Sequence, residues 1–496
     1  MSIHIISVLG TDLYQPVNYD HEGKFKYVQS ALIKKYQTDL SDPASRVTIF
    51  LTSDAEKRNW IDNIATERDA EQSSKWGEDA LHVGDLKKGL HSEIKENFSD
   101  DIEEKLNTVA IPDGKNDTEI WQIFRALCEA IGEKDQIIFD ITHSFRSIPM
   151  LAITALNYAK VTKDCTIRGI YYGAYEAGTV EDGQKQVPIF DLTIYNEILD
   201  WAHAASTLKE YGNPKELDDI IKQRFRNNLI SDKEKAAWSN IRGHISAMCS
   251  LTETLSACRG LGAYAAGKKS PQQYSIQAAY QNLKKHKLSP AAEEKKDSLL
   301  PLHDLLDKAE KSFDEYEFKE TQPYKVGMAA AKWCIDHDMT EQAYTALEET
   351  AKTFICDYYG LPDIDEMNRD RIAGGALNGI AHYMQNMQKN RIRFQESVDR
   401  GQMLTEIQRD YSKKLADLTP EQKDAFDRIV RTVPLSYAIE TARLKDLRND
   451  INHFGIRNKP MNYQTLQTSA GEIYTDLLNE MTRMENAQSN STKGEA

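Results

Sequence analysis

The chain has 496 residues and a formal net charge of −15 at pH 7, with 40% hydrophobic and 28% charged residues. This composition is that of an ordinary globular protein with two or three domains. It argues against a protein that binds long nucleic acids non-specifically, because such proteins are usually basic, so we expect any contact with RNA to be local.

The six cysteines are scattered without Cys-x2-Cys spacing. This argues against a zinc site or a disulfide framework and favours a reducing cytoplasm, with the cysteines acting as small buried hydrophobic residues. No apolar run reaches membrane-spanning length, and the N-terminus lacks the basic-then-apolar order of a signal peptide. We therefore expect a cytoplasmic protein with no metal, no cofactor and no membrane contact.

The first 195 residues alternate predicted strands with predicted helices. Helices are expected at 26–35, after the capping cluster 52–54, at 118–131 and at 148–161. A turn at 181–183 is expected to join the last two strands, and the predicted strands are 3–9, 47–51, 108–111, 136–141, 166–175 and 187–192. This alternation predicts an α/β domain with a Rossmann-like, mostly parallel sheet.

From about residue 194 onward the strand signals stop and the pattern is helical. Helices are predicted at 201–209, 214–229, 236–261, 271–287, 290–318, 324–337, 340–359, 374–388, 421–429 and after Pro434. The polar segment 388–417 is expected to be an exposed helix or loop, and 486–496 a frayed tail. We therefore predict domains at 1–195, 196–335 and 336–496, the middle one a helical connecting region.

Two predicted strand ends carry residues suited to a ligand. In an open α/β sheet, ligands bind outside the carboxyl ends of the strands, where the strand order reverses. Gly10 allows close backbone approach and Thr11 offers a hydroxyl, while the helix after Arg146 presents free N–H groups suited to phosphate. There is no Gly-x-Gly-x-x-Gly after the first strand, which disfavours a nicotinamide or flavin enzyme. The alternatives are a plain turn at Gly10 and Thr11, and a capping or ion-paired role for His143 and Arg146.

The stretch 440–455 reads as one helix with a polar seam, ended by Gly455. At about 100° per residue, an apolar stripe is predicted for Leu444, Leu447, Ile451 and Phe454, beside a polar arc of Arg448, Asn449, Asn452 and His453. Arg448 and His453 diverge by about 140°, so one helix makes a poor two-residue site. Two copies related by a two-fold axis could bring both pairs together.

This polar seam suggests RNA cleavage without metal. A histidine can move the proton of a ribose 2′-hydroxyl or of the leaving oxygen, and an arginine can hold the phosphate as its charge shifts. The helix dipole near its C-terminal end favours the imidazolium. The simpler alternative is a solvated charged face.

Two sets of motifs resemble one known family. The run 447–454 closely resembles the Arg-Asn-x3-His motif of HEPN ribonucleases, and 338–360 is similar to an earlier helix of that domain. At the other end, 7–14, 27–32 and 140–149 resemble the CARF domain of CRISPR-associated CARF-HEPN ribonucleases. The resemblance covers both ends of the chain in the expected order, while 196–335 matches only loosely.

The resemblance implies a homodimer, or a higher oligomer, that acts in type III CRISPR antiviral defence. Its CARF domains would bind cyclic oligoadenylate, with the tetra-adenylate favoured and the hexa-adenylate second. Binding would allosterically activate a metal-independent endonuclease site that cleaves single-stranded RNA, leaving 2′,3′-cyclic phosphate or 3′-phosphate ends, without stable DNA binding. The implied catalytic residues are Arg448, Asn449 and His453. The implied ligand-binding residues are Gly10, Thr11, Asp12, Tyr14, Thr142, His143, Ser144, Phe145 and Arg146.

Two other functions stay open on the sequence alone. A non-enzymatic sensor of cyclic oligonucleotides, with a helical interaction module, predicts that His453→Ala leaves every activity intact. A constitutive HEPN toxin ribonuclease predicts RNA cleavage that needs no activator.

Overall fold

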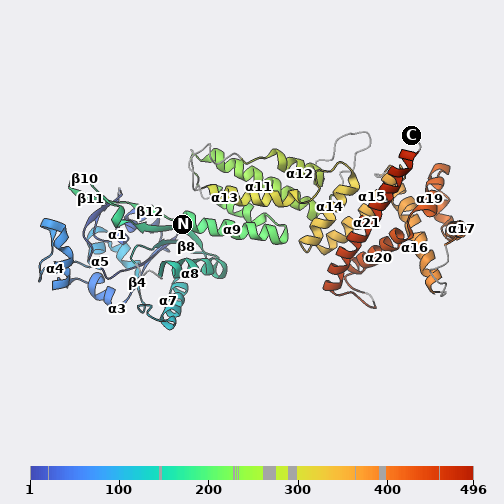
Figure 1. Ribbon diagram of the computed structural model, residues 1–496. Helices are drawn as coiled ribbons and strands as arrows, with labels where there is room; N and C mark the ends of the chain where they lie inside the picture. The colour runs from blue at the N-terminus through green and yellow to red at the C-terminus, as the bar shows by residue number, and fades with distance from the viewer. Residues whose placement is uncertain are drawn as a thin grey trace. The chain divides into compact units, whose positions relative to one another are not determined.

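The computed structural model describes residues 2–20, 22–143, 148–181, 183–226, 230, 232, 234–260, 275–288, 299–362, 365–389, 398–456 and 458–494 (Figure 1). The chain divides into two units, Met1–Leu199 and Asp200–Ala496. The first is an α/β unit and the second is helical, which confirms the predicted fold class.

A six-stranded sheet with the order β12-β9-β8-β1-β4-β7 forms the centre of the first unit. Neighbouring strands are parallel, except that β12 runs antiparallel to β9. The strands are β1 (Ile3–Val8), β4 (Arg46–Leu51), β7 (Leu106–Ala110), β8 (Gln136–Asp140), β9 (Thr166–Gly173) and β12 (Ile189–Asp191). Every residue of β1 is buried, because it lies inside the sheet and helices cover both faces.

Alternate residues of β1 point to two separate cores. Ile3 and Ile5 pack in a core with residues of α1 (Val28–Lys35) and α5 (Leu90–Asn97). Ile6 and Val8 pack in the other with α7 (Asp117–Ala130) and α8 (Ile148–Lys163). The shorter helices are α2 (Gln37–Leu40), α3 (Ser53–Ala55), η1 (Glu56–Trp60), α4 (Glu67–Ser73), η2 (Ser74–Asp79), α6 (Asp100–Glu104) and η3 (Tyr175–Ala177).

Two small sheets were not predicted. One has the order β10-β11-β2-β3, with β2 (Val17–Tyr19), β3 (Gly23–Phe25), β10 (Thr179–Glu181) and β11 (Gln184–Val187); the other pairs β5 (Asn63–Ile64) with β6 (Leu86–Lys87). The turn at 181–183, whose Asp182 lies outside the described residues, therefore joins β10 to β11 and not two strands of the main sheet. The single strand predicted at 187–192 is also wrong, since it is interrupted at Pro188, which has no N–H to donate to a ladder.

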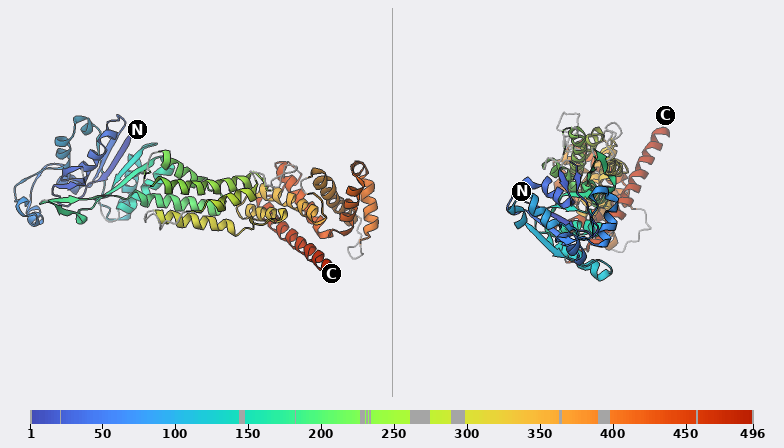
Figure 2. Two further views of the ribbon diagram at one scale, coloured as in Figure 1. Left: turned by 90° about the horizontal axis from the view of Figure 1, so that it is seen from above. Right: turned by 90° about the vertical axis from the view of Figure 1, so that its left-hand side faces the viewer.

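The second unit is built from helices, and no described residue beyond Asp191 forms a strand. Helices α11 and α13 lie side by side (Figure 2), where Glu310 of α13 pairs with Lys284 of α12 and lies near His244 of α11. The helices of this part of the chain are α9 (Thr193–Tyr211), α10 (Lys215–Arg226), α11 (Lys235–Ser256), α12 (Ile276–Lys285), α13 (Leu300–Asp314), α14 (Pro323–Asp336), α15 (Thr340–Tyr358), η6 (Met367–Ala373), α16 (Gly374–Lys389), α17 (Arg400–Asp410), α18 (Ser412–Leu415), α19 (Pro420–Thr432), α20 (Leu435–Asn452) and α21 (Tyr463–Gly494).

One apolar core joins α14 to α21 and corrects two expectations. Within the polar segment 388–417, α17 buries Met403, Leu404 and Ile407, so this segment is not simply exposed. The tail predicted to fray from residue 486 instead continues as helix α21 to Gly494. That helix is held by apolar residues at helical spacing: Ala470, Ile473, Leu477, Met481 and Met484.

The cysteines differ in their exposure to solvent. Among the six cysteines, Cys165, Cys334 and Cys356 are buried but Cys258 is exposed, so the expectation that all are buried is wrong. In the part of the chain that the structure describes, no helix combines the length and the apolar character needed to cross a membrane.

Candidate functional site

The strand order of the first unit reverses between β1 and β8. From β1 the chain moves outward to β4 and β7 on one side, and then returns to β8 and β9 on the other. Ser7 near the end of β1 lies opposite Asp140, the last residue of β8. The two segments that the sequence singled out, Gly10–Thr11 and Thr142–His143, therefore leave the sheet from adjacent strands at the place where such sheets bind ligands.

Tyr14 joins these two segments. Its ring lies 4.2 Å from the His143 ring, centroid to centroid, and 5.6 Å from the Tyr27 ring. A Cβ atom on Gly10 would lie 2.3 Å from the Tyr14 hydroxyl, so this position needs glycine as long as Tyr14 stays in place. Asn59 fixes the turn at Gly10–Asp12, because its side-chain amide donates to the carbonyls of Gly10 and Asp12, each at 2.8 Å.

A buried carboxylate network lies at the ends of β1 and β8, the position of the ligand crevice in open α/β sheets. Asp140 accepts hydrogen bonds from the Ser7 hydroxyl at 2.6 Å, the Gln29 amide at 3.2 Å and the Thr142 hydroxyl at 2.5 Å. Burial raises the pKa of Asp140 above its ordinary value. The Thr142 hydroxyl also accepts from the Gly173 N–H at 2.8 Å, so Thr142 holds the loop to the sheet.

Three buried polar atoms around this crevice lack a hydrogen-bond partner among the described residues: Gln29 Oε1, Asn59 Oδ1 and His143 Nε2. Burial lowers the pKa of His143 to about 3, so its ring is neutral at physiological pH. Buried polar groups of this kind are normally satisfied, and a polar ligand would satisfy them. Thr11 is half-buried and Asp12 exposed, whereas Ser144, Phe145 and Arg146 lie outside the described residues.

Helix α20 carries the second set of predicted residues and is fixed to α15. The buried Tyr437 hydroxyl donates to the Ala351 carbonyl at 2.8 Å, and Leu444 and Leu447 are buried in the core. The helix ends at Asn452, three residues earlier than predicted. Phe454 does not continue the apolar stripe: with φ of +55° it leaves the helix, and its side chain is 93% exposed.

Arg448 points toward α15 and forms an ion pair there. Its Nη1 lies 3.0 Å from Oε2 of Glu348, a residue that is only 8% exposed. The other carboxylate oxygen of Glu348 lies 3.1 Å from Nζ of Lys352. Burial opposes the charge on Lys352, but the carboxylates of Glu349 and Glu348 outweigh that effect and raise its pKa. Arg448 is thus held at a fixed place by a charge network.

His453 has a different environment. It follows the last residue of α20 and is exposed, while Asn449, four residues earlier, is half-buried. The buried Asp450 anchors the loop beyond it, because its carboxylate accepts from the Met461 N–H at 2.8 Å. No hydrogen bond or ion pair joins Arg448 to His453 within the part of the chain that the structure describes, as their angular divergence predicts.

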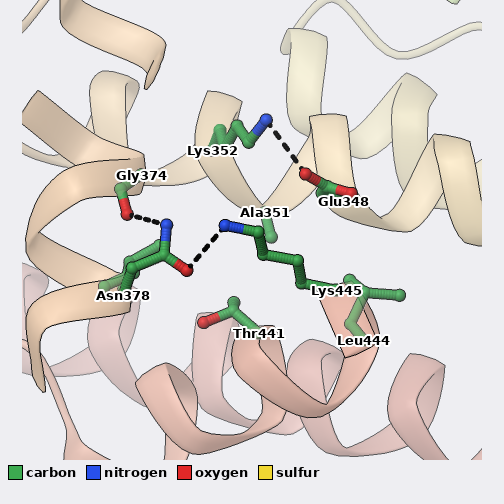
Figure 3. A pocket seen from close by; sticks show the side chains of 9 residues that line it. Glu348, Ala351, Lys352, Gly374, Asn378, Thr441, Leu444 and Lys445 are labelled. Carbon is green, nitrogen blue, oxygen red and sulfur yellow. Dashed lines mark hydrogen bonds and ion pairs between the residues drawn. The ribbon is translucent and has the colours of Figure 1, made fainter. Parts of the chain in front are cut away.

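A small pocket lies beside the Arg448 ion pair, between α15, α16 and α20 (Figure 3). Ala351, Leu377 and Leu444 form apolar walls. Figure 3 shows Lys445 directed at Asn378, whose side-chain oxygen accepts from Nζ at 3.3 Å. Glu348 also lines this pocket, and because Glu348 pairs with Arg448, the pocket lies next to Arg448.

Sequence reasoning missed Glu348, Lys352, Asn378, Thr441 and Lys445. One signal was present: Glu348 stands four residues after Tyr344 and three before Ala351, within an apolar helical stripe. A carboxylate on such a stripe must be paired if it is buried. The identity of its partner on α20, more than ninety residues away, carries no sequence signal.

Comparison with known proteins gives two similarities. Residues 4–176 match the family model described as the CARF domain of the CRISPR system endoribonuclease Csx1. The chain is also similar to the CRISPR-associated protein MJ1674 of Methanocaldococcus jannaschii, with 26% identity over 326 residues. That alignment covers 62% of this chain and 43% of the relative, so the chain spans less than half the length of the relative.

Proposed function

We propose that this CRISPR-associated CARF protein is a metal-independent endoribonuclease that cuts single-stranded RNA once cyclic oligoadenylate has bound its first unit. The observation that carries the proposal is the end of α20, where His453 is exposed just beyond the helix and Arg448 is held by Glu348. The similarity of residues 4–176 to a CARF domain supports the class of activator.

The proposed reaction is an intramolecular transesterification of the RNA phosphodiester. The ribose 2′-oxygen attacks the adjacent phosphorus and the 5′-oxygen of the next nucleotide leaves, which yields a 2′,3′-cyclic phosphate and a 5′-hydroxyl. His453 accepts the 2′-hydroxyl proton or donates a proton to the leaving oxygen. Arg448 binds the non-bridging phosphate oxygens as their charge develops, and the Asn449 amide adds a donor.

A complete site requires two copies of the chain. Arg448 lies on α20 and pairs with Glu348 of α15, whereas His453 lies beyond the end of the helix. Apolar residues follow His453 in the sequence. Four side chains there are strongly exposed: Phe454 at 93%, Ile456 at 83%, Met461 at 48% and Tyr463 at 56%. Exposed apolar residues that gather in one region mark interaction sites. We propose that a second copy covers them and brings its own Arg448 and His453 to the same RNA.

The crevice between β1 and β8 is the proposed site of the activator. Three buried, unpartnered polar atoms there, Gln29 Oε1, Asn59 Oδ1 and His143 Nε2, can bond the polar edges of a nucleotide. Helix α8 begins at Ile148 after β8, and a helix N-terminus is suited to bind a phosphate. The activator can shift the nuclease only as far as it binds the active arrangement more tightly than the resting one. We propose cyclic tetra-adenylate first and the hexa-adenylate second.

The test is cleavage of a fluorogenic single-stranded RNA in EDTA, with no additive or with cyclic tri-, tetra- or hexa-adenylate. His453→Ala is compared with the control His203→Ala, which removes another exposed histidine of the helical unit. We expect cleavage with one ring size only, unchanged by the control and lost in His453→Ala. A single 2′-deoxy nucleotide at the cut position should block the reaction, because it removes the attacking oxygen.

Three outcomes would contradict the proposal. Cleavage without any activator would indicate a constitutive ribonuclease. No cleavage with any ring, together with binding of one ring to the full chain, would indicate a sensor without nuclease activity. Full cleavage by His453→Ala would place the catalytic site elsewhere.

A further inference from the structure

The pocket beside Arg448 has the construction of a small-molecule subsite. Its walls are the apolar side chains of Ala351 and Leu377 and the fully buried Leu444. Its polar groups come from two helices: Asn378 of α16, and Thr441 and Lys445 of α20. Apolar walls with a few convergent donors and acceptors are the usual composition of a ligand site. The pocket is small and partly open to solvent, so it has room for the edge of a flat heterocycle and not for a whole ring system.

Lys445 and Asn378 can exchange their hydrogen bond to each other for hydrogen bonds to a ligand. Lys445 is exposed, and its contact with the Asn378 side-chain oxygen, at 3.3 Å, is long for a hydrogen bond. The Asn378 amide nitrogen is held by the Gly374 carbonyl at 2.6 Å, which fixes the side chain with its oxygen directed at the pocket (Figure 3). A ligand edge that carries a donor next to an acceptor could insert between the Asn378 oxygen and the Lys445 ammonium, and every nucleobase has such an edge.

The pocket's charges disfavour a free phosphate. Lys352 is one of its two cations, but its ammonium is already shared by the carboxylates of Glu348, Glu349 and Asp370, at 3.1, 3.0 and 3.2 Å. The Glu348 carboxylate also faces the pocket. This leaves Lys445 alone to attract an anion, whereas the apolar walls favour a base.

The pocket adjoins the proposed catalytic arginine in two ways. Glu348 both lines the pocket and pairs with Arg448 at 3.0 Å. Lys445 precedes Arg448 by three residues on α20, so the two side chains are neighbours on the helix surface, about one turn apart. A phosphate held by Arg448 would therefore carry its neighbouring nucleotide to the mouth of the pocket.

We propose that this pocket binds the edge of one nucleobase of the RNA next to the cleaved phosphate and sets the base preference of the cut. The inference rests on the proposed ribonuclease function and adds to it a specificity site made by Asn378, Thr441 and Lys445. Because all three lie within one helical unit, each copy of the chain contributes its own base pocket.

The experiment uses the full chain, its activator and a pool of single-stranded RNA with randomised sequence, and the cut ends are sequenced. The variants are Asn378→Ala, Lys445→Met and the nearly isosteric Thr441→Val, with melting curves to confirm folding. Lys423→Met is the control, since Lys423 is an exposed lysine of the same unit that does not line the pocket. The wild type and the control should show a base bias at one position beside the cut. Asn378→Ala and Lys445→Met should reduce that bias about fivefold, the loss expected for one hydrogen bond to a base.

Binding provides a second readout that separates this inference from the proposed function. Affinities of His453→Ala protein for labelled homopolymers of the four bases are measured with and without Lys445→Met. Unequal affinities that Lys445→Met equalises support the pocket, even if no condition gives cleavage and the ribonuclease proposal fails. Unaltered base bias in Asn378→Ala and Lys445→Met, or equal affinities for all four homopolymers, would overturn the inference while leaving the ribonuclease proposal intact.

Discussion

Arg448 and His453 should differ in their effect on stability although both are needed for cleavage. Arg448→Ala removes the partner of a buried carboxylate, since Glu348 is 8% exposed and lies 3.0 Å from the Arg448 guanidinium. His453 is exposed and has no such partner among the described residues. Loss of cleavage in His453→Ala should therefore come with unchanged stability, and loss in Arg448→Ala with a clear destabilisation.

The size of this effect follows from the exposure of the pair. Breaking a fully buried ion pair costs about 3–5 kcal/mol, whereas an exposed pair contributes about 0–1 kcal/mol. The Arg448 side chain is 29% exposed, and Lys352 stays 3.1 Å from Glu348 after the substitution. We therefore expect Arg448→Ala to lower the free energy of unfolding by about 1–2 kcal/mol, which for a unit spanning Asp200–Ala496 corresponds to a fall in Tm of about 2–3 °C.

The assay is thermal and urea unfolding of the full chain, with Arg448→Ala, Glu348→Gln, the double variant and His453→Ala. Because the two side chains touch, the double variant should be less destabilised than the sum of the single ones, by about 1 kcal/mol. Equal loss of Tm in His453→Ala and Arg448→Ala, or strict additivity in the double variant, would refute the reasoning.

Three further predictions concern the crevice and the end of α20. Gly10→Ala places a methyl group 2.3 Å from the Tyr14 hydroxyl, so it should raise the activator concentration for half-maximal cleavage about tenfold or more; unchanged activation would contradict the placement of the activator. The pKa of His143 falls from 6.5 in the unfolded chain to about 3 on burial, so the neutral ring's contribution to stability is complete above pH 6.5 and is lost as the pH falls. At pH 5.5 the loss is about 1.4 kcal/mol, and urea titrations should show it in the wild type and not in His143→Gln. Phe454→Gly relieves a left-handed backbone (φ +55°) and should stabilise the chain by about 0.5–1 kcal/mol, yet weaken self-association in analytical ultracentrifugation; an unchanged dimer would exclude Phe454 from the interface.

The sequence alone indicated where strands give way to helices: no strand was predicted beyond residue 192, and the last described strand, β12, ends at Asp191. The apolar runs at 3–9 and 136–141 do not alternate apolar with polar residues, because both faces of their strands are buried. These runs therefore identify the centre of the sheet. Helical spacing predicted that the side chains of Arg448 and His453 diverge, and in the structure His453 lies beyond the last residue of α20. Because both patterns depend on residues close in sequence, local physics suffices to read them.

Some local predictions were still wrong, each for an identifiable reason. Pro188 interrupts a ladder that the apolar residues 187–192 suggested. Helix α21 was missed because its buried residues between Ala470 and Met484 are spread through a polar sequence, and its polar end from residue 486 was expected to fray. Phe454 was assigned to the core, but a left-handed turn directs it to solvent.

Only the tertiary structure decided which distant residues meet. The adjacency of Gly10 and His143 follows from the order β4-β1-β8, in which strands more than one hundred residues apart pair. The pairing of Arg448 with Glu348, and the pocket formed with Asn378, depend on how three helices pack. Side-chain periodicity determines which face of a helix is buried, but it carries no information about the partner that buries it. That choice is made by the packing of the whole core.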